Sequence, residues 1–420
     1  MNKQQIIAGV ELGSSKVATL IAQVATDPQG FERKINVVGV AEVPSAGVKK
    51  GQIVDIEAAV EATINSVESA ERMAGYNLDR AFVALSGAHI ASQNSQGVVA
   101  VSNPDSEIND ADVDRAIEAA SAVSVPSSRE IVHVLPREFT VDGEKGVKDP
   151  VGMSGVRLEV ETHLITASTA ATKNLKKAVN EVGIEIEEVV FSGLASTYAV
   201  LSNTEKELGC VLVDIGGGTT TIVAYVDGAL AHSSVVPIGA KNITSDLAIG
   251  LRVSLESAEK IKLKLSELDK RTSKGEDEIE LKEIGVSEVK KASRKTLTDG
   301  IVRPRLNEIF TMVRLDLEKA GISTKIPSGV IVTGGGADTV GVVDAAKRMT
   351  ALPARLGKPK GVGGLIDDII KPAYATPVGL ILYGATSEPA QALTSFTKRL
   401  KLPTKGLFGK AVNTIRDLLP

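Results

Sequence analysis

The sequence predicts an α/β fold built from two related halves, and three glycine-rich motifs carry this prediction. The first, CVLVDIGGGTTTIVAYVDGAL (210–230), places an acidic residue, three glycines and three threonines between two apolar runs. A weaker copy, IIAGVELGSSKVATLIAQV, begins at Ile6 and has the same order of strand, carboxylate, glycine, hydroxyl residues and second strand. The third, SGVIVTGGGADTVGVVDAAKRM (328–349), runs from an apolar strand through three glycines into a helix. Because Glu11 and Asp214 lie about half a chain apart, the pair indicates a duplicated fold and not a stack of short repeats.

Composition limits the class of protein. The chain has 420 residues, of which 43% are hydrophobic and 24% charged, as in a globular protein large enough for two or more cores. It has no Trp and only 3% aromatic residues, so we expect a core of Val, Ile, Leu and Ala. The single Cys210 excludes an internal disulfide, and no apolar stretch approaches the roughly 20 residues of a membrane-spanning helix. The formal net charge of −4 argues against nucleic acid as a partner.

The two strand–glycine–strand motifs have the chemistry of anion-binding hairpins. Their glycines allow tight turns whose consecutive N–H groups can bind phosphate, and the hydroxyls and one lysine add further donors. The residues predicted to contact the anion are Gly13, Ser14, Ser15 and Lys16 in the first motif and Asp214, Gly216, Gly217, Gly218, Thr219 and Thr220 in the second. A carboxylate beside a phosphate requires a divalent cation between them, so Glu11 and Asp214 are predicted to bind Mg²⁺ through water. The alternative is that both motifs are ordinary hairpin turns.

The third motif is typical of a nucleotide site at a helix N-terminus. Gly334, Gly335 and Gly336 follow the strand, and the next helix is predicted to bury Val340, Val343 and Ala346. The contiguous glycines do not fit the dinucleotide-binding pattern G-x-G-x-x-G, and no GK[ST] follows as in a P-loop.

A charged helix is predicted upstream of the third motif. In SAEKIKLKLSEL (257–268), Ile261, Leu265 and Leu268 recur at helical spacing. This spacing places Glu259 and Lys262 on one face, either as ligand-binding residues or as part of a solvated charged surface.

Together, the three motifs resemble the nucleotide-binding fold shared by actin, sugar kinases and the large heat-shock chaperones. The resemblance implies an actin-like (ribonuclease-H-like, duplicated) fold with two lobes around a nucleotide cleft. It implies that ELGSSK (11–16) and DIGGGTTT (214–221) bind the phosphates of ATP and that TGGGAD (333–338) binds adenosine. Glu259 and Lys262 then correspond to residues that reach ribose and base, and Gly239 falls where relatives place a glycine near the nucleotide.

Further segments make the resemblance closer. Five segments are similar to the FtsA family of bacterial cell-division proteins. They are VALSGAHI (83–90), IVHVLPREFTVDG (131–143), KDPVGMSGVRLEVETHLIT (148–166), FSGLASTYAVL (191–201) and an amphipathic C-terminus. Relatives often have Asn where this chain has Asp149.

The FtsA resemblance implies an inserted α+β subdomain and a corresponding division of the chain. The predicted parts are 1–83 and 163–204 for the first core half, closed by about 371–385; 84–162 for the insert; 205–240 and 300–370 for the second half; and 241–299 for its peripheral lobe. Within the insert, Asn109 is predicted to cap a helix with an apolar stripe at Val113, Ile117 and Ala120. The segment REIVHVLPREFTVDGE (129–144) is predicted to be rich in strand.

Two departures from relatives predict tight ATP binding with weak or absent ATPase activity. Relatives often use Glu or Gln to position the attacking water where this chain has Ser192, and an acidic residue where Thr221 stands. Serine cannot act as a carboxylate base, and loss of a general base costs about 10²–10⁴-fold in rate. No residue is therefore assigned as catalytic. The four histidines are scattered without metal-ligand spacing, and we expect them to be structural.

The C-terminal segment 405–420 predicts an amphipathic helix that binds a membrane surface. At about 100° per residue, its apolar side chains share one side of the helix. The residues predicted to contact the membrane are Leu407, Phe408, Val412, Ile415, Leu418 and Leu419, flanked by the basic Lys405, Lys410 and Arg416. A polar segment, 386–404, is predicted to be a flexible linker. The alternative is a terminal helix that docks on its own domain, but the linker and basic flank favour an anionic membrane.

The FtsA resemblance also implies a function. It describes a cytoplasmic ATP-binding protein that self-associates as a filament or oligomer and anchors polymers of the tubulin-like FtsZ to the inner membrane at the division septum. It also implies recruitment of later division proteins. Two alternatives stay open: a type IV pilus platform protein of the same fold, which would lack the basic tail, and a sugar-kinase-type phosphotransferase, which would need a catalytic Asp.

Overall fold

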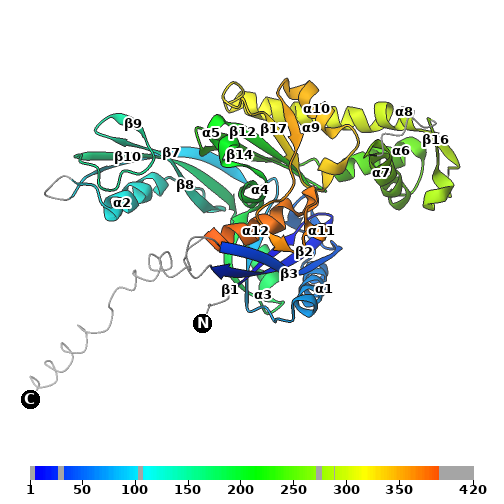
Figure 1. Ribbon diagram of the computed structural model, residues 1–420, viewed down its shortest axis with the longest axis horizontal. Coiled ribbons are helices and arrows are strands. Elements are labelled where there is room, and N and C mark those ends of the chain that lie inside the picture. The colour runs from blue at the N-terminus through cyan, green and yellow to red at the C-terminus, as the bar shows by residue number, and fades with distance from the viewer. Residues whose placement is uncertain (1–4, 27–32, 103–106, 271–276, 288, 387–420) are drawn as a thin grey trace, which may run out of the picture.

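The computed structural model describes residues 5–26, 33–102, 107–270, 277–287 and 289–386. Figure 1 shows three parts: a first sheet (blue) with its helices, a second sheet (green to yellow) beside it, and a separate antiparallel sheet (cyan to green) that extends to the left. The helix predicted for 405–420, and all but the first residue of the linker predicted for 386–404, lie outside the described residues. No described helix combines the length and the hydrophobicity needed to cross a membrane.

The first sheet mixes antiparallel and parallel strands. In spatial order its strands are β11 (Glu185–Phe191), β6 (Arg80–Leu85), β1 (Gln5–Leu12), β2 (Lys16–Thr26), β3 (Arg33–Pro44) and β19 (Gly363–Gly364). β2 pairs antiparallel with both β1 and β3, whereas β6 pairs parallel with both β1 and β11. A glycine-containing hairpin therefore joins β1 to β2 near the centre of the sheet.

The second sheet repeats this arrangement. Its strands are β14 (Ala229–Val236), β13 (Thr220–Val226), β12 (Cys210–Ile215), β17 (Val330–Thr333) and β18 (Ala354–Leu356). β13 pairs antiparallel with β12 and β14, and β17 pairs parallel with β12 and β18. Glu11 and Asp214 are each the penultimate residue of the first strand of their sheet. The predicted duplication is confirmed.

Helices cover the sheets and join the halves. The first half carries α1 (Ile56–Ala74), α3 (Thr169–Asn180), α4 (Ser192–Val200) and α12 (Ala375–Thr386), and the second carries α5 (Asn203–Leu208), α9 (Arg303–Lys319) and α10 (Val342–Thr350). α1 begins at the N-cap Asp55 and ends at Gly75, whose φ of 72° favours glycine. α12 packs closely on α4, because a Cβ on Gly379 would lie 1.9 Å from the Ala195 carbonyl oxygen.

The peripheral lobe follows β14 and surrounds a helix pair. It contains α6 (Ala240–Leu251), α7 (Leu255–Lys270), β15 (Glu278–Glu280), the 3₁₀ turn η1 (Leu281–Ile284), β16 (Lys291–Ser293), α8 (Arg294–Leu297) and the π-helical turn η2 (Thr298–Val302). The helix predicted from the 257–268 pattern is confirmed as part of α7, with Ile261 and Leu265 fully buried. The remaining short elements are β4 (Val48–Lys49), β5 (Gln52–Ile53), η3 (Gly335–Asp338), α11 (Ile366–Ile369) and η4 (Pro372–Tyr374).

The inserted part is a four-stranded sheet covered by one helix. Its strands, in order, are β7 (Ala91–Ala100), β10 (Arg157–Ser168), β8 (Arg129–Val141) and β9 (Glu144–Val147), with α2 (Asp110–Ser121) against β7 and β10. The predicted N-cap at Asn109 is confirmed, and a capping box pairs Asn109 with Asp112. The predicted apolar stripe is confirmed: Ala120 is fully buried, and the half-buried Val113 and Ile117 pack against the same hydrophobic cluster, to which Ala116 also belongs. The residues of α2 closest to the sheet are alanines, because the helix lies directly on Gly97 and leaves no room there for larger side chains.

The helix after the third glycine motif starts later than the sequence predicted. Gly335–Asp338 forms a 3₁₀ turn, and α10 begins only at Val342. Val340 is buried but precedes the helix, and Val343 is only half-buried, while Ala346 is buried as predicted. The extra turn arises because Gly341, at φ 75°, redirects the chain before the helix.

Among the described residues, one hydrophobic cluster joins the first half to one face of the second sheet, where it includes Leu212, Val223 and Ile331. A second cluster covers the other face of that sheet and extends into the peripheral lobe, and a third lies in the insert. As predicted, Val, Ile, Leu and Ala supply most of the buried side chains.

Candidate functional site

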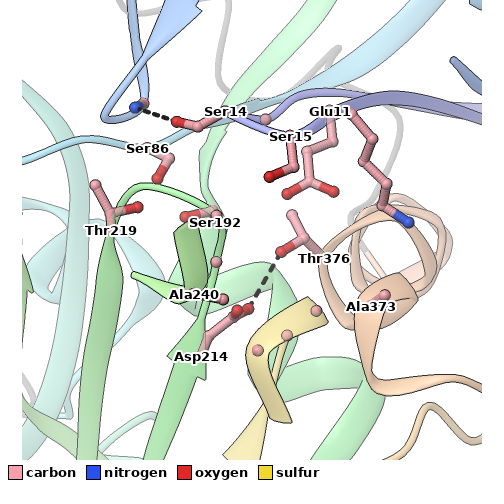
Figure 2. Close-up of a pocket in the computed structure, with 18 of the residues that line it drawn as sticks. Glu11, Ser14, Ser15, Ser86, Ser192, Asp214, Thr219, Ala240, Ala373 and Thr376 are labelled. Atoms are coloured by element: carbon pink, nitrogen blue, oxygen red, sulfur yellow. Dashed lines mark hydrogen bonds between the residues drawn. The ribbon is translucent and has the colours of Figure 1, made fainter. Parts of the chain in front are cut away.

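A cleft between the two halves brings most of the predicted site residues together. Both strand–glycine hairpins, the GGG turn, the N-terminus of α6 and the middle of α7 line it, and Figure 2 shows several of their side chains pointing into it. The predicted residues that line it are Glu11, Gly13, Ser14, Ser15, Lys16, Asp214, Gly216, Gly217, Thr219, Glu259, Lys262, Gly334, Gly335 and Gly336.

Three predicted residues do not line the cleft. A Cβ on Gly218 would lie 3.0 Å from the Ser14 Oγ, so this glycine packs against the opposite hairpin. Thr220 is fully buried, and its hydroxyl donates to the Ile238 carbonyl at 2.9 Å. Gly239 is the N-cap of α6, where a Cβ would lie 2.6 Å from the Gly216 carbonyl oxygen. Gly218 and Gly239 therefore shape the loops, and the Thr220 hydroxyl fixes β13.

The first hairpin is held by its own backbone and by its neighbours. The Gly13 N–H donates to the Lys16 carbonyl at 2.9 Å, which closes the turn. The Ser14 Oγ accepts a hydrogen bond from the Gly51 N–H at 2.9 Å. The Lys16 ammonium donates to Glu42 at 2.8 Å and lies 3.7 Å from the centre of the Tyr374 ring. Lys16 is therefore positioned at the edge of the cleft by a carboxylate and an aromatic face.

The second hairpin is held by α6. The Gly216 N–H donates to the Thr219 carbonyl, and the N–H groups of Ala240 and Lys241 donate to the carbonyls of Gly216 and Gly217, each at 2.9 Å. These N-terminal amides of α6 are therefore used to fix the loop. The Lys241 ammonium, from α6, donates to the Ser14 carbonyl in the first hairpin at 2.7 Å, so it ties the two hairpins together.

Two carboxylates from the two halves face the cleft. Burial raises the pKa of Glu11 to about 7; Lys16 opposes this shift, and Asp214 and Glu42 reinforce it. Burial also raises the pKa of Asp214, against hydrogen bonds from Ser196 and Thr376. Two partly desolvated carboxylates repel each other, and a divalent cation with its water shell would relieve both costs. Within the described ranges, no group of three or more His, Cys, Asp or Glu side chains could hold a metal directly. Glu11 and Asp214 therefore fit a Mg²⁺ ion that is held through its water molecules and partly by a bound ligand.

Asp214 is positioned by two hydroxyls that the sequence analysis missed. The Ser196 Oγ on α4 donates to Asp214 Oδ2 at 2.7 Å, and the Thr376 Oγ1 on α12 lies 3.4 Å from the same oxygen, as Figure 2 shows for Thr376. The two hydroxyls also lie 2.9 Å from each other. α4 contacts strands of both sheets, and α12 packs on α4 and on the first sheet. Through these two helices Asp214 is linked to the first half. Nothing in the local sequence distinguishes these hydroxyls from other Ser and Thr residues.

Two of the three glycines of the third motif, Gly334 and Gly336, are required by close packing. Gly334 has φ 84°, and a Cβ there would lie 2.2 Å from Asp214 Oδ1. A Cβ on Gly336 would lie 2.4 Å from Ile215 Cγ2, whereas one on Gly335 would meet only Ala373, at 3.9 Å. Gly335 therefore faces the open part of the cleft.

Glu259 and Lys262 enter the cleft as a bonded pair. The Lys262 ammonium, on a residue only 8% exposed, donates to Glu259 Oε2 at 2.7 Å. This contact disfavours the solvated-surface interpretation of the two residues, because a buried ammonium must be paired.

Ser192 and Thr221, the two departures from relatives, both line the cleft. Ser192 is the first residue of α4, and Figure 2 shows it between the second hairpin and Asp214. A hydroxyl at this place can orient a water molecule but cannot take its proton at neutral pH.

Comparisons with solved structures show the fold. The PilM–PilN type IV pilus biogenesis complex contains a chain that aligns with a TM-score of 0.64 at 18% identity, over 91% of this chain and 99% of that one. MreB 5 of Spiroplasma citri bound to AMPPNP aligns with a TM-score of 0.53 at 15% identity, over 94% and 99% of the two chains. The predicted actin-like fold is confirmed.

Sequence comparisons show the family. The model of the SHS2 domain inserted in FtsA matches residues 87–166, and the model of the cell division protein FtsA matches residues 211–379. The cell division protein FtsA of Pseudomonas aeruginosa is 40% identical over 381 residues, which cover 90% of this chain and 89% of that protein. The FtsA protein of Borreliella burgdorferi is 37% identical over 403 residues, which cover 96% of each chain. The chain belongs to the FtsA family of actin-like cell-division proteins.

Proposed function

We propose that this FtsA-family protein binds ATP with Mg²⁺ in the cleft between its halves. The observation that carries the proposal is the convergence of two duplicated glycine hairpins, one carboxylate from each, and a third glycine turn on one crevice. Such hairpins bind phosphate, and the carboxylates suit a hydrated Mg²⁺. The neighbouring fold of MreB 5, solved with AMPPNP, supports the same kind of ligand. The residues predicted from sequence to contact ATP remain our assignment, with the first and second hairpins on the phosphates and the GGG turn on adenosine.

A pair of substitutions at Gly335 tests this proposal. Because Gly335 faces open space, Gly335→Ala should be accommodated, whereas Gly335→Val should project into the cleft and weaken ATP binding at least tenfold. Calorimetric titration with ATP, with and without Mg²⁺, measures both. Equal affinity in the two variants would place the nucleotide elsewhere.

We propose that turnover of the bound ATP is slow or absent. Ser192 stands where a general base would be needed, and it cannot act as one. ATP then serves as a structural and switching ligand. Single-turnover hydrolysis assays on the purified protein test this, and the Ser192→Glu variant measures what the missing carboxylate would add.

We propose that the protein self-associates and ties FtsZ polymers to the cytoplasmic face of the inner membrane at the septum, where later division proteins join. Membrane attachment is assigned to the amphipathic stripe of 405–420. Burial of a few large apolar side chains is largely offset by the cost of ordering about 13 residues, so one helix binds weakly. Many helices on one polymer bind firmly through effective concentration. FtsZ binding and self-association rest on family membership.

The membrane assignment is tested by deletion and by a matched pair of charges. Removal of residues 406–420 should release the protein from anionic vesicles while ATP binding is retained. On the helical wheel, Phe408 lies in the apolar stripe and Asn413 on the polar side, so Phe408→Glu should abolish flotation and Asn413→Glu should leave it nearly unchanged. Flotation of the deleted protein would refute the assignment. Co-flotation of FtsZ with the intact protein tests the partner.

The division of the chain into two core halves, an insert (84–162) and a peripheral lobe (241–299) is likewise our assignment.

A further inference from the structure

Thr244, which was not among the predicted site residues, lies directly behind the Glu259–Lys262 pair. It belongs to α6, it is 5% exposed, and it does not line the cleft. Its Oγ1 lies 2.6 Å from Glu259 Oε2 and accepts a hydrogen bond from the Lys262 ammonium at 3.0 Å. A hydroxyl that accepts from lysine and donates to a carboxylate satisfies both partners with one atom.

These contacts leave the two oxygens of Glu259 in different states. Oε2 receives hydrogen bonds from both Thr244 and Lys262, at 2.6 and 2.7 Å. In the part of the chain that the structure describes, no donor contacts Oε1. The Glu259 side chain is 43% exposed and lines the cleft, so Oε1 is open to a ligand. A carboxylate oxygen only accepts, so the complementary ligand group is a hydrogen-bond donor.

The position of Thr244 along α6 indicates which part of a nucleotide can reach Glu259 Oε1. Ala240, at the start of α6, donates to the second hairpin and lines the cleft, and Thr244 follows four residues later. Four residues of helix span about 6 Å, so Glu259 lies roughly one turn from the phosphate-binding hairpin. The sugar is joined directly to the phosphates, whereas the base lies farther away. The donor that best fits this distance is therefore a ribose hydroxyl, and the exocyclic amine of the base is the competing donor.

We infer that Thr244 is a positioning residue that fixes Glu259 and Lys262 so that Glu259 Oε1 accepts a hydrogen bond from a ribose hydroxyl, and that it thereby selects ribonucleotides over deoxyribonucleotides. The inference rests on the proposed ATP binding. It adds that sugar selectivity depends on a side chain that never touches the ligand.

The experiment compares the dissociation constants of ATP, 2′-deoxy-ATP and 3′-deoxy-ATP for the full-length protein and three variants. Thr244→Val removes the hydroxyl at nearly constant volume, and Thr244→Ser retains it. Ser245→Ala is the matched control, since the Ser245 hydroxyl donates to the Lys241 carbonyl of its own helix. In the wild type we expect at least one deoxynucleotide to bind at least tenfold more weakly than ATP. Thr244→Val should reduce that ratio at least threefold by weakening ATP alone, whereas Thr244→Ser and Ser245→Ala should keep the wild-type ratio.

Each other outcome has a definite meaning. If Thr244→Val weakens all three nucleotides equally, Thr244 is merely structural and the inference is overturned. If the wild type binds the three equally but prefers ATP to inosine triphosphate at least tenfold, Glu259 reads the base and the inference fails while ATP binding stands. If no nucleotide binds, the proposed function itself fails. Should Thr244→Val not fold, Glu259→Gln gives the same test, because a lost selectivity with retained deoxynucleotide binding supports the role of the carboxylate.

Discussion

Ser15 and Gly217, one from each glycine hairpin, lie so close that a Cβ on Gly217 would be 2.0 Å from the Ser15 Oγ and 3.0 Å from its Cβ. The two residues come from separate halves of the chain, so the hairpins share one crevice. The glycine is needed for this approach and not for its own backbone conformation, since Gly217 does not have a positive φ. The separation of the hairpins is therefore set by one missing side chain.

Gly217→Ala should weaken ATP binding severalfold. The Ser15 hydroxyl can rotate away from the added methyl group, but the Ser15 Cβ at 3.0 Å cannot, so the hairpins must separate by a few tenths of an ångström. In the double variant Ser15→Gly/Gly217→Ala, the nearest remaining atom of residue 15 is its backbone nitrogen at 3.4 Å, which is an ordinary contact. Titration calorimetry should show most of the affinity restored relative to Ser15→Gly alone. No rescue by the double variant would mean that the contact does not control the cleft.

The Mg²⁺ dependence of ATP binding should weaken as pH falls. Burial raises the pKa of Glu11 to about 7, so its carboxyl group is mostly protonated at pH 6 and mostly ionised at pH 8. Because only the carboxylate attracts hydrated Mg²⁺, the apparent Mg²⁺ affinity should be about tenfold lower at pH 6 than at pH 8. Titration of the ATP complex with Mg²⁺ at several pH values measures this. The Glu11→Gln variant should bind Mg²⁺ weakly at every pH, and an unchanged pH dependence in that variant would assign the effect to another group.

Glu11 should also affect the stability of the ligand-free fold. Here the change to glutamine is favourable at high pH, whereas it is unfavourable for Mg²⁺ binding. The pKa of Glu11 is 4.5 in the unfolded chain and about 7 in the ligand-free fold, so the fold binds the proton more tightly. Its contribution is fully present below pH 4.5 and is lost as pH rises through 7, on the order of 3 kcal/mol. Without nucleotide and Mg²⁺ at pH 8, Glu11→Gln should therefore unfold at a higher temperature than the wild type.

The local parts of the site could be predicted from the sequence, because consecutive residues determine their structure and their chemistry. A strand, a carboxylate and a run of glycines specify a tight hairpin wherever it lies, and its repetition at Glu11 and Asp214 predicts the duplicated sheets. The N-cap at Asn109 is equally local, since the capping box needs only the residues next to the helix.

The supporting contacts could not be predicted, because they join hydroxyls and amines from distant segments. Ser196 and Thr376 reach Asp214 from two helices, and Lys241 of α6 reaches Ser14 in the first hairpin. Each belongs to a residue type that is common on helix surfaces, so only the packing of the halves distinguishes it. The late start of α10 was missed for a related reason: apolar spacing over 340–346 fits a helix, while the positive φ of Gly341 is set by the turn before it.

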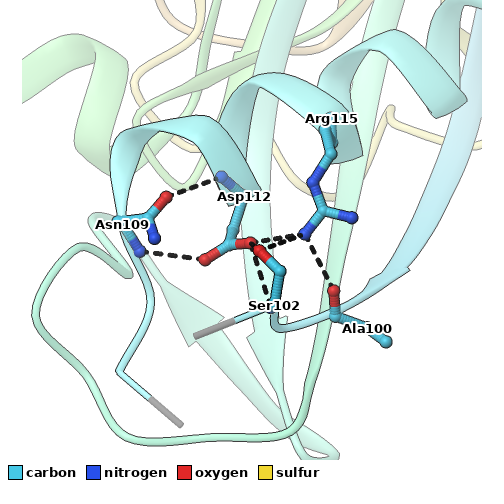
Figure 3. Close-up of polar contacts among 5 residues, drawn as sticks. All are labelled: Ala100, Ser102, Asn109, Asp112 and Arg115. Atoms are coloured by element: carbon cyan, nitrogen blue, oxygen red, sulfur yellow. Dashed lines mark hydrogen bonds and ion pairs between the residues drawn. The ribbon is translucent and has the colours of Figure 1, made fainter. Parts of the chain in front are cut away.

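Asp112 should be a main support of the insert. It is fully buried, and Figure 3 shows it between the Asn109 backbone, the Ser102 hydroxyl and the Arg115 guanidinium. Burial alone would raise the pKa of Asp112, but these hydrogen bonds have the larger combined effect and lower it to about 2. Asp112→Ala leaves the partly exposed Arg115 guanidinium and a helix cap without their partner, so it should cost about 1–3 kcal/mol. Hydrogen exchange of the α2 amides measures the loss.

Asp110→Ala provides the matched control for Asp112, because Asp110 is an exposed carboxylate in the same first turn. Its effect should stay below about 1 kcal/mol, the usual size of a helix-dipole interaction. ATP binding should be unchanged in both variants, since neither residue lines the cleft. Equal exchange rates for the two variants would contradict a special role for Asp112.

His163 should make the attachment of the insert to the second half sensitive to acid. Its ring nitrogens lie 2.7 Å from Asn94 Oδ1 and 2.9 Å from the Ser233 Oγ, so it bridges β7 and β14. Burial, together with His232 and Arg137, lowers its pKa from 6.5 to about 3. The unfolded chain therefore binds a proton that the fold excludes, and stability that is full above pH 6.5 is lost as pH falls toward 3.

The test of this acid sensitivity is the pH dependence of urea unfolding in the wild type and in His163→Gln. Between pH 6 and pH 5 one excluded proton costs about 1.4 kcal/mol per pH unit, and the glutamine variant should lack that slope. His133, whose pKa burial lowers to about 4, adds a similar slope to both proteins, so their difference isolates His163. Hydrogen exchange should show the β7 and β14 amides losing protection first in the wild type on acidification. Parallel stability curves for the two proteins would mean that His163 is protonated in the fold, and the bridge would then not respond to acid.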